Sequence, residues 1–189
     1  MGNVHVSRQK AMTIPSAQIE LGKKSYGQKE VGHSFGGEEL ANIILARKNF
    51  KSYPWMDIAW QEYKRGVREI KGGKHNQRIL LYHSYTTLKA TADEVPWCSS
   101  AANYCVAQAG FEPTRSAAAR SWLNFGEKIE NPFYSCIVVF RRGSSPTAGH
   151  VAFYITTIGE NILCLGGNQS DTWTVAFYPK KNVLGYRGV

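Results

Sequence analysis

The chain has 189 residues, enough to bury one substantial hydrophobic core, and its hydrophobic fraction of 43% argues against disorder as the dominant state. No uninterrupted apolar run approaches the roughly 20 residues that cross a bilayer, so membrane insertion is not expected. The net charge of +9 favours anionic partners such as nucleic acid, anionic lipid or an acidic cell wall. Because the basic residues form scattered pairs and no recognised nucleic-acid motif, nucleic acid is not expected as a partner.

Residues 1–53 are predicted to be a basic N-terminal extension that precedes the main domain at 54–189. One short helix is expected over 38–48, with Ile43 and Ile44 on its apolar face and an acidic start and a basic end that suit the helix dipole. Two interpretations stay open: an appendage that packs on the main domain, or a docking or delivery element. The N-terminus lacks the pattern of a secretory signal, which predicts synthesis in the cytoplasm and delivery by other machinery.

The main domain is expected to begin with helices and to end with strands. Gly- and Asn-containing turns separate short apolar segments after Pro132, as in an antiparallel sheet of about five strands. Helices first and antiparallel strands afterwards define an α+β arrangement. Four helices are expected: one that begins at Pro54, one near 77–83, one between Pro96 and Gly110, and one over 117–125. The expected strands cover about 136–140, 150–157, 161–166, 172–178 and 183–187.

Cys98 stands where a loop enters a helix, because Pro96 disfavours helix before it and apolar residues recur at helical spacing after it. A helix N-terminus favours an anion, and it can lower a thiol pKa from about 8.5 to roughly 3.5–7.5. Only the thiolate is a nucleophile, so this position suits a catalytic cysteine. The alternative interpretation of Cys98 is a small core cysteine. No CxxC pair or paired histidine spacing predicts a metal site.

A histidine and an asparagine follow on later strands. His150 opens the segment GHVAFYI directly after a Gly-containing turn, and Asn168 follows the next strand in the run LGGNQ. A cysteine at a helix start, a histidine on one strand and an amide on the next are one arrangement of nucleophile, base and orienting group. These residues form a site only if the three elements are adjacent in space.

Five ordered blocks make the chain recognisable from Pro54 to Arg187. They are EVPWCS at 94–99, SAAARSWL at 116–123, IVVF at 137–140, GHVAFY at 149–154 and LGGNQ at 165–169. In these blocks the chain resembles the CHAP/NlpC-like cysteine amidohydrolases of bacterial cell-wall peptides, as found in antibacterial type VI secretion effectors and phage lysins.

The resemblance implies a papain-like α+β fold and hydrolysis of an amide bond in peptidoglycan, by an amidase or endopeptidase that needs no cofactor. It places the nucleophile at Cys98, the base at His150 and the polar third member at Asn168. Trp97 and the loop of Arg142 are interpreted as borders of the substrate groove. One departure affects the turn before the IVVF strand, where the family usually has Gly-Asp and this chain has Ser135-Cys136.

The function expected from the resemblance is that of an antibacterial effector that a secretion system delivers to the periplasm or cell wall of a target cell. That role implies a cognate immunity protein and secretion machinery as partners. Two alternatives stay open: a phage-type endolysin with the same chemistry, and a catalytically inactive module that binds the cell wall or a partner.

Overall fold

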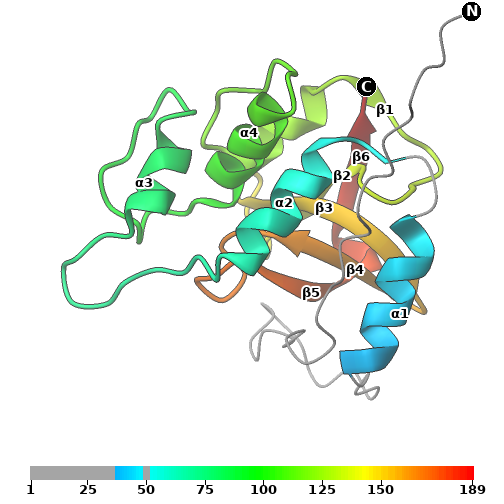
Figure 1. Cartoon of the computed structure of the whole chain (residues 1–189). Coiled ribbons are helices and arrows are strands. Elements are labelled where there is room, and N and C mark those ends of the chain that lie inside the picture. The colour runs from blue at the N-terminus through cyan, green and yellow to red at the C-terminus, as the bar shows by residue number, and fades with distance from the viewer. Residues whose placement is uncertain (1–36, 49–51) are drawn as a thin grey trace, which may run out of the picture.

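The first half of the described chain is helical and the second half is a sheet (Figure 1). The computed structural model describes residues 37–48 and 52–189. The helices are α1 (Gly37–Lys48), α2 (Trp55–Lys64), α3 (Gln77–His83), α4 (Cys98–Gln108) and two 3-10 helices, η2 (Ala119–Asn124) and η3 (Lys180–Asn182). The strands are β1 (Glu127–Lys128), β2 (Ile137–Arg141), β3 (Gly149–Ile158), β4 (Asn161–Gly166), β5 (Thr174–Pro179) and β6 (Val183–Gly188). Within the described ranges, no helix has the length and apolar character needed to span a membrane.

The predicted α+β class is confirmed, and each of the five expected strands lies within two residues of an observed one. A sixth strand, β1, was not expected, because its two exposed residues lack any apolar alternation. The helix expected over 117–125 is the shorter 3-10 helix η2. It begins two residues later than predicted because the backbone of Ala118 is extended.

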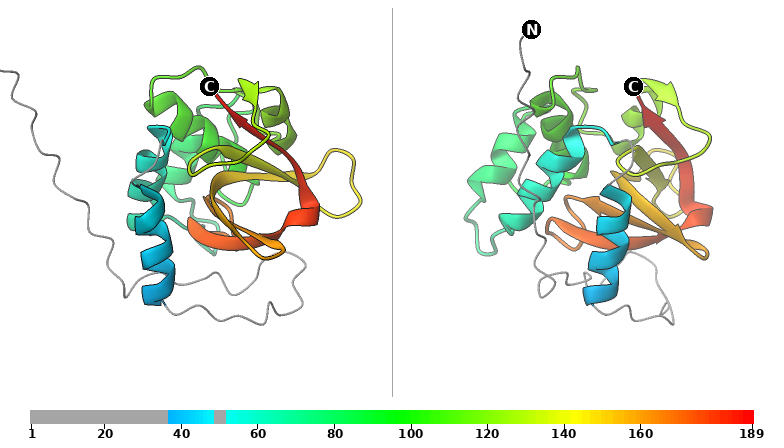
Figure 2. Two further views of the ribbon diagram at one scale, coloured as in Figure 1. Left: turned by 90° about the vertical axis from the view of Figure 1, so that its right-hand side faces the viewer. Right: turned by 45° about the vertical axis from the view of Figure 1, so that its right-hand side comes forward.

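The sheet is entirely antiparallel, with the strand order β1-β6-β2-β3-β4-β5. Phe140 on β2 and Tyr178 on β5 stack with ring centroids 4.7 Å apart, although two strands separate β2 from β5. Neighbouring strands lie about 4.8 Å apart, so a flat sheet would hold these rings roughly 14 Å apart. The sheet therefore curls strongly, as its curved strands show (Figure 2), and brings distant strands around one interior.

Helix α4 is held against the sheet and against its neighbouring helices. It packs on β3 and β4, while α2 and α3 pack beside it. Buried Glu62 on α2 accepts hydrogen bonds from Arg78 Nε at 2.9 Å and from the Tyr82 hydroxyl at 2.6 Å, both on α3. Arg78 also donates to the Tyr104 hydroxyl on α4 at 2.6 Å. Burial raises the pKa of Glu62, but the hydrogen bonds from Arg78 and Tyr82 outweigh it and lower the pKa.

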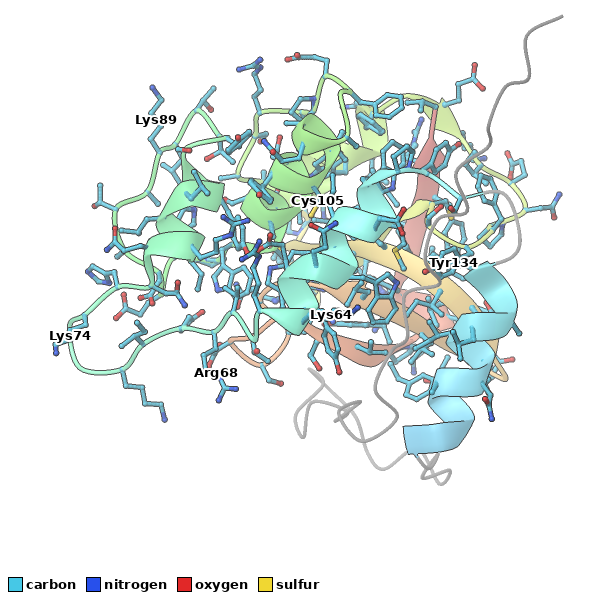
Figure 3. All side chains as sticks on the ribbon, in the orientation of Figure 1. Lys64, Arg68, Lys74, Lys89, Cys105 and Tyr134 are labelled. Carbon is cyan, nitrogen blue, oxygen red and sulfur yellow. The ribbon has the colours of Figure 1, made fainter. Side chains whose placement is uncertain are left out.

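Exposed lysines lie on the outside of this helical layer (Figure 3). Lys64, Lys74 and Lys89 are exposed, whereas Cys105 is buried in the middle of α4. Lysines project their charge into water and leave the interior to apolar groups. The positive charge is therefore available to an anionic partner.

Helix α1 contributes to the same core as the main domain. Ala41 and Ile44 are buried in the cluster of core residues. Tyr53, the last residue of the predicted extension, also contacts the main domain: its hydroxyl donates to the carbonyl oxygen of Val189 at 2.7 Å. The rest of the predicted extension, residues 1–36 and 49–51, lies outside the described residues.

The departure at Ser135 falls on a position with unusual backbone geometry. Ser135 has φ +80°, in the left-handed region that favours glycine, which is the residue usual there in the family that the chain resembles. Its hydroxyl accepts a hydrogen bond from the backbone N–H of Tyr53 at 2.6 Å, and its carbonyl oxygen accepts one from Trp55 Nε1 at 2.8 Å. These two hydrogen bonds offset the backbone strain at Ser135, so serine in place of the usual glycine changes only this turn.

Candidate active site

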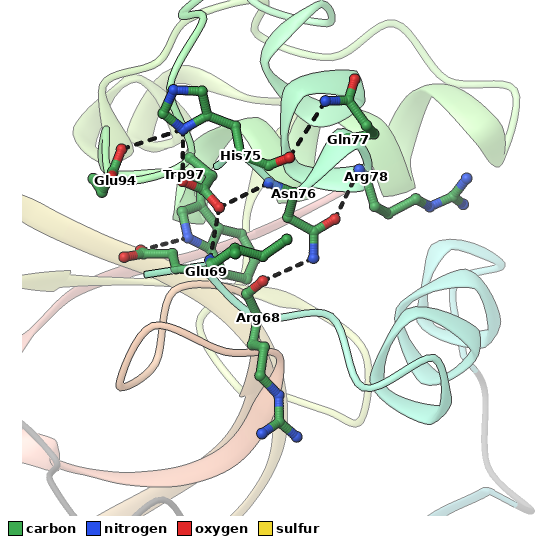
Figure 4. Close-up of polar contacts among 10 residues, drawn as sticks. Arg68, Glu69, His75, Asn76, Gln77, Arg78, Glu94 and Trp97 are labelled. Carbon is green, nitrogen blue, oxygen red and sulfur yellow. Dashed lines mark hydrogen bonds and ion pairs between the residues drawn. The ribbon is translucent and has the colours of Figure 1, made fainter. Parts of the chain in front are cut away.

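Cys98 is the first residue of α4, as predicted, and packing of the residue before it explains its position. Trp97 is completely buried, and its Nε1 donates to Glu69 Oε1 at 2.9 Å (Figure 4). A Cβ atom at Gly167, in the loop after β4, would overlap the Trp97 ring and lie 2.8 Å from Ala101 Cβ. The tryptophan before the cysteine and the glycine pair of LGGNQ are thus complementary in shape. Trp97 lies in the core and does not border a groove, in contrast to its predicted position.

A buried carboxylate holds the segment that leads into Cys98. Asp93 Oδ2 accepts hydrogen bonds from the backbone N–H groups of Ile70 and Asn76, each at 2.9 Å, and Oδ1 lies 3.1 Å from His75 Nδ1 (Figure 4). Glu94 Oε2 lies 3.5 Å from the same nitrogen. His75, Asp93 and Glu94 are the one group in the described part of the chain with metal-ligand spacing. Because hydrogen bonds already occupy both Asp93 oxygens, the cluster is explained as a clamp between two loops.

The block at 116–123 joins the cysteine helix to the loop before His150. Trp122 Nε1 donates to Ser99 Oγ, next to the cysteine, at 2.9 Å. Arg120, two residues earlier, donates from Nε to the carbonyl oxygen of Ala148 at 2.9 Å and from Nη2 to that of Ser145 at 2.7 Å. One short 3-10 helix therefore positions both the start of α4 and the start of β3.

His150 lies at the start of β3 with its tautomer set by Gln169. Its Nε2 lies 3.0 Å from Gln169 Oε1, and Gln169 Nε2 donates to the carbonyl oxygen of Thr174. The second bond fixes the orientation of the amide, so the atom that faces the histidine is an acceptor. Nε2 must then carry the proton, which leaves Nδ1 of a neutral imidazole with its lone pair. Nδ1 is buried and has no hydrogen-bond partner within the described residues.

The hydrogen bond predicted for Asn168 is made in the structure by its neighbour, Gln169. Asn168 has φ +57°, a left-handed conformation that asparagine tolerates better than most residues, and it turns the chain after β4. Gln169, the next residue, is buried with its side chain against His150. The structure thus brings His150 and Gln169 together, and no hydrogen bond is described between His150 and Asn168.

The thiol of Cys98 lies beside the start of β3. The backbone N–H of Val151, the residue after His150, lowers the pKa of this thiol. The exposed fractions of Cys98, His150 and Gln169 are 5%, 2% and 2%, so the three side chains are almost completely shielded from solvent. Tyr178 stacks on the imidazole of His150 at a centroid distance of 4.9 Å and restricts its rotation.

Burial controls the charge of Cys98 and of His150. It raises the pKa of the Cys98 thiol, and this outweighs the lowering by the Val151 N–H and by the positive charge of Arg142. The prediction that the helix start lowers this pKa is therefore wrong for the resting site, because a dipole at the helix end is weaker than the loss of water. Burial also lowers the pKa of His150 to about 4; the hydrogen bond that its Nε2 donates to Gln169 raises the pKa, and the charge of Arg142 lowers it further. At neutral pH the site holds a neutral thiol and a neutral imidazole.

Comparison with protein-family models finds no match for this chain, and comparison with curated proteins also finds none.

Proposed function

We propose that the chain is a cysteine-dependent amidohydrolase of papain-like fold that cleaves an amide bond in bacterial cell-wall peptide. The observation that carries the proposal is the state of His150. Gln169 holds the proton on Nε2, and the buried lone pair on Nδ1 has no partner within the described residues. Such a nitrogen on the strand that packs against the Cys98 helix is suited to accept a thiol proton.

In the proposed reaction, the Cys98 sulfur attacks the amide carbonyl while its proton passes to His150 Nδ1. The two residues are not hydrogen-bonded in the resting conformation, and catalytic pairs often approach only when substrate binds. The backbone N–H of Cys98 at the helix start is the proposed donor to the tetrahedral oxyanion, a contribution of about 2.7–4 kcal/mol for a single donor. The imidazolium then protonates the leaving amine, and a water molecule activated by Nδ1 hydrolyses the thioester.

Two features support peptidoglycan as the substrate: the resemblance of the five sequence blocks, and the charge of +9, which attracts an anionic wall. We propose the role of an effector delivered by a secretion system to the wall of a target cell, with a cognate immunity protein. A phage-type endolysin with the same chemistry is the alternative within the enzyme class. The inactive binding module is favoured by one observation, that neither Cys98 nor His150 is charged at rest.

Digestion of purified peptidoglycan tests the proposal and separates the enzyme from the binding module. The wild-type chain is expected to release muropeptides, and mass spectrometry of the fragments identifies the scissile bond. Cys98→Ala is expected to lower the rate by at least about 10³-fold, because the covalent step is lost. Cys105→Ala, seven residues along the same helix, is the matched control and should keep the activity. Release of fragments by Cys98→Ala at the wild-type rate would exclude the cysteine mechanism.

A further inference from the structure

Arg142 lies on the same face of the β2–β3 hairpin as the base. In the register of these strands Phe140 pairs with His150 and Arg141 pairs with Gly149. The ladder continues with a hydrogen bond of 3.4 Å from the Arg142 N–H to the carbonyl oxygen of Ala148. Side chains alternate between the faces of a strand, so Arg142 shares the face of Phe140 and His150. Arg141 takes the opposite face, where it is exposed and donates to Asn182 Oδ1 at 3.2 Å.

The loop that carries Arg142 is held in place. Arg120 binds the carbonyl oxygens of Ser145 and Ala148, and Ser145 Oγ accepts from the Ala148 N–H at 3.0 Å. Arg142 itself is half-buried, in contrast to its exposed neighbour Arg141. A charged side chain in partly dry surroundings acts more strongly on its neighbours than one in water.

The charge of Arg142 acts on both reacting groups. It lowers the pKa of the Cys98 thiol and also lowers that of His150, so it favours the thiolate and disfavours the imidazolium. The other groups that act on the sulfur are N–H donors of Cys98, Ser99 and Val151. The ion pair of α2 and α3 acts on Cys105, further along α4.

We propose that Arg142 is an electrostatic positioning residue, whose guanidinium stabilises the negative charge that develops at the Cys98 sulfur. The proposal rests on the proposed use of Cys98 as the nucleophile. A neutral resting thiol needs such help, because its proton must leave before or during attack and burial opposes the resulting anion. The half-buried cation on the hairpin supplies a charge that the helix start alone does not.

The test is the pH dependence of Cys98 alkylation by iodoacetamide, followed by peptide mass spectrometry in the intact chain. Arg142→Met removes the charge and keeps an unbranched apolar stem, and it is expected to raise the apparent pKa of Cys98 by roughly 0.5–1 unit. Arg142→Lys should restore most of the wild-type profile. Arg141→Met removes an equal charge from the opposite face and should leave the profile unchanged.

An unshifted profile for Arg142→Met, or an equal shift for Arg141→Met, would overturn the proposal. Loss of folding is detected in the same spectra, because Cys105, Cys136 and Cys164 have an exposed fraction of 0%, against 5% for Cys98, and become reactive only when the chain opens. If the Met variant is unstable, Arg142→Lys tests the proposal by itself, because it preserves the charge. An apparent pKa of Cys98 that rises in the Lys variant by the roughly 0.5–1 unit expected for loss of the charge contradicts the proposal. Alkylation needs no substrate, so a failure to cleave peptidoglycan refutes the proposed function and leaves this result standing.

Discussion

Acidification should destabilise the fold through His150. The folded-state pKa is about 4, below the ordinary value of 6.5, so the unfolded chain takes up this proton first as the pH falls. The stabilising contribution is fully present above pH 6.5 and is lost between pH 6.5 and 4. A difference of about 2.5 units at 1.36 kcal/mol per unit corresponds to about 3 kcal/mol of unfolding free energy. That loss is a large part of the 5–15 kcal/mol typical of a domain.

Urea denaturation from pH 7 to pH 4.5 measures this loss, with His150→Gln as the comparison because it does not titrate. Burial lowers the pKa of His83 as well, so both proteins lose stability through that residue. Glu62 and Asp93 have lowered pKa values and lose their contributions only below about pH 4.5. The unfolding free energy of the wild type should therefore fall more steeply than that of the variant. Parallel curves above pH 4.5 would refute the assignment of a buried, neutral His150.

Three further results are expected. Gln169→Leu should lower kcat/KM for peptidoglycan by at least about 10-fold, because the tautomer of the histidine is no longer held; Asn168→Gly should keep the activity, since glycine accepts the φ of +57°. Gly167→Ala should lower the unfolding free energy in urea by about 1–3 kcal/mol or more, since the added methyl overlaps the Trp97 ring. Glu62→Gln should lower the unfolding free energy by about 1.5–3 kcal/mol in the same measurement, because it removes the buried carboxylate that accepts hydrogen bonds from the partly exposed Arg78 guanidinium and from the Tyr82 hydroxyl.

Each stability measurement has a matched control in the chain. Gly185→Ala adds the same methyl where it meets only the movable Leu123 side chain at 3.2 Å, so a small change is expected. Glu112→Gln breaks an exposed ion pair with Arg115, and water screens such a pair, so a small change is expected. Equal losses for Gly167→Ala and Gly185→Ala, or for Glu62→Gln and Glu112→Gln, would contradict the structural explanation. Wild-type activity in both Gln169→Leu and Asn168→Gly would show that neither amide orients the histidine.

The order and type of the elements could be predicted from the sequence because they depend on neighbouring residues. Pro96 and the apolar spacing after it place Cys98 at the start of α4, and turn residues separate the strands that include His150. The exceptions are short: β1 has two residues, and η2 has the tighter 3-10 geometry. Both exist because of contacts with distant parts of the chain, β1 by pairing with β6 and η2 by packing on the sheet.

The identity of the amide beside His150 depended on the tertiary structure. Asn168 and Gln169 are adjacent in the sequence and offer the same functional group. The left-handed turn at Asn168 and the bond from Gln169 to Thr174 decide which of the two reaches the imidazole. The charge state of Cys98 and His150 also depended on the tertiary structure. A helix start is visible in the sequence, but the enclosure of Cys98 by a curled sheet is not, and the removal of water outweighs the dipole.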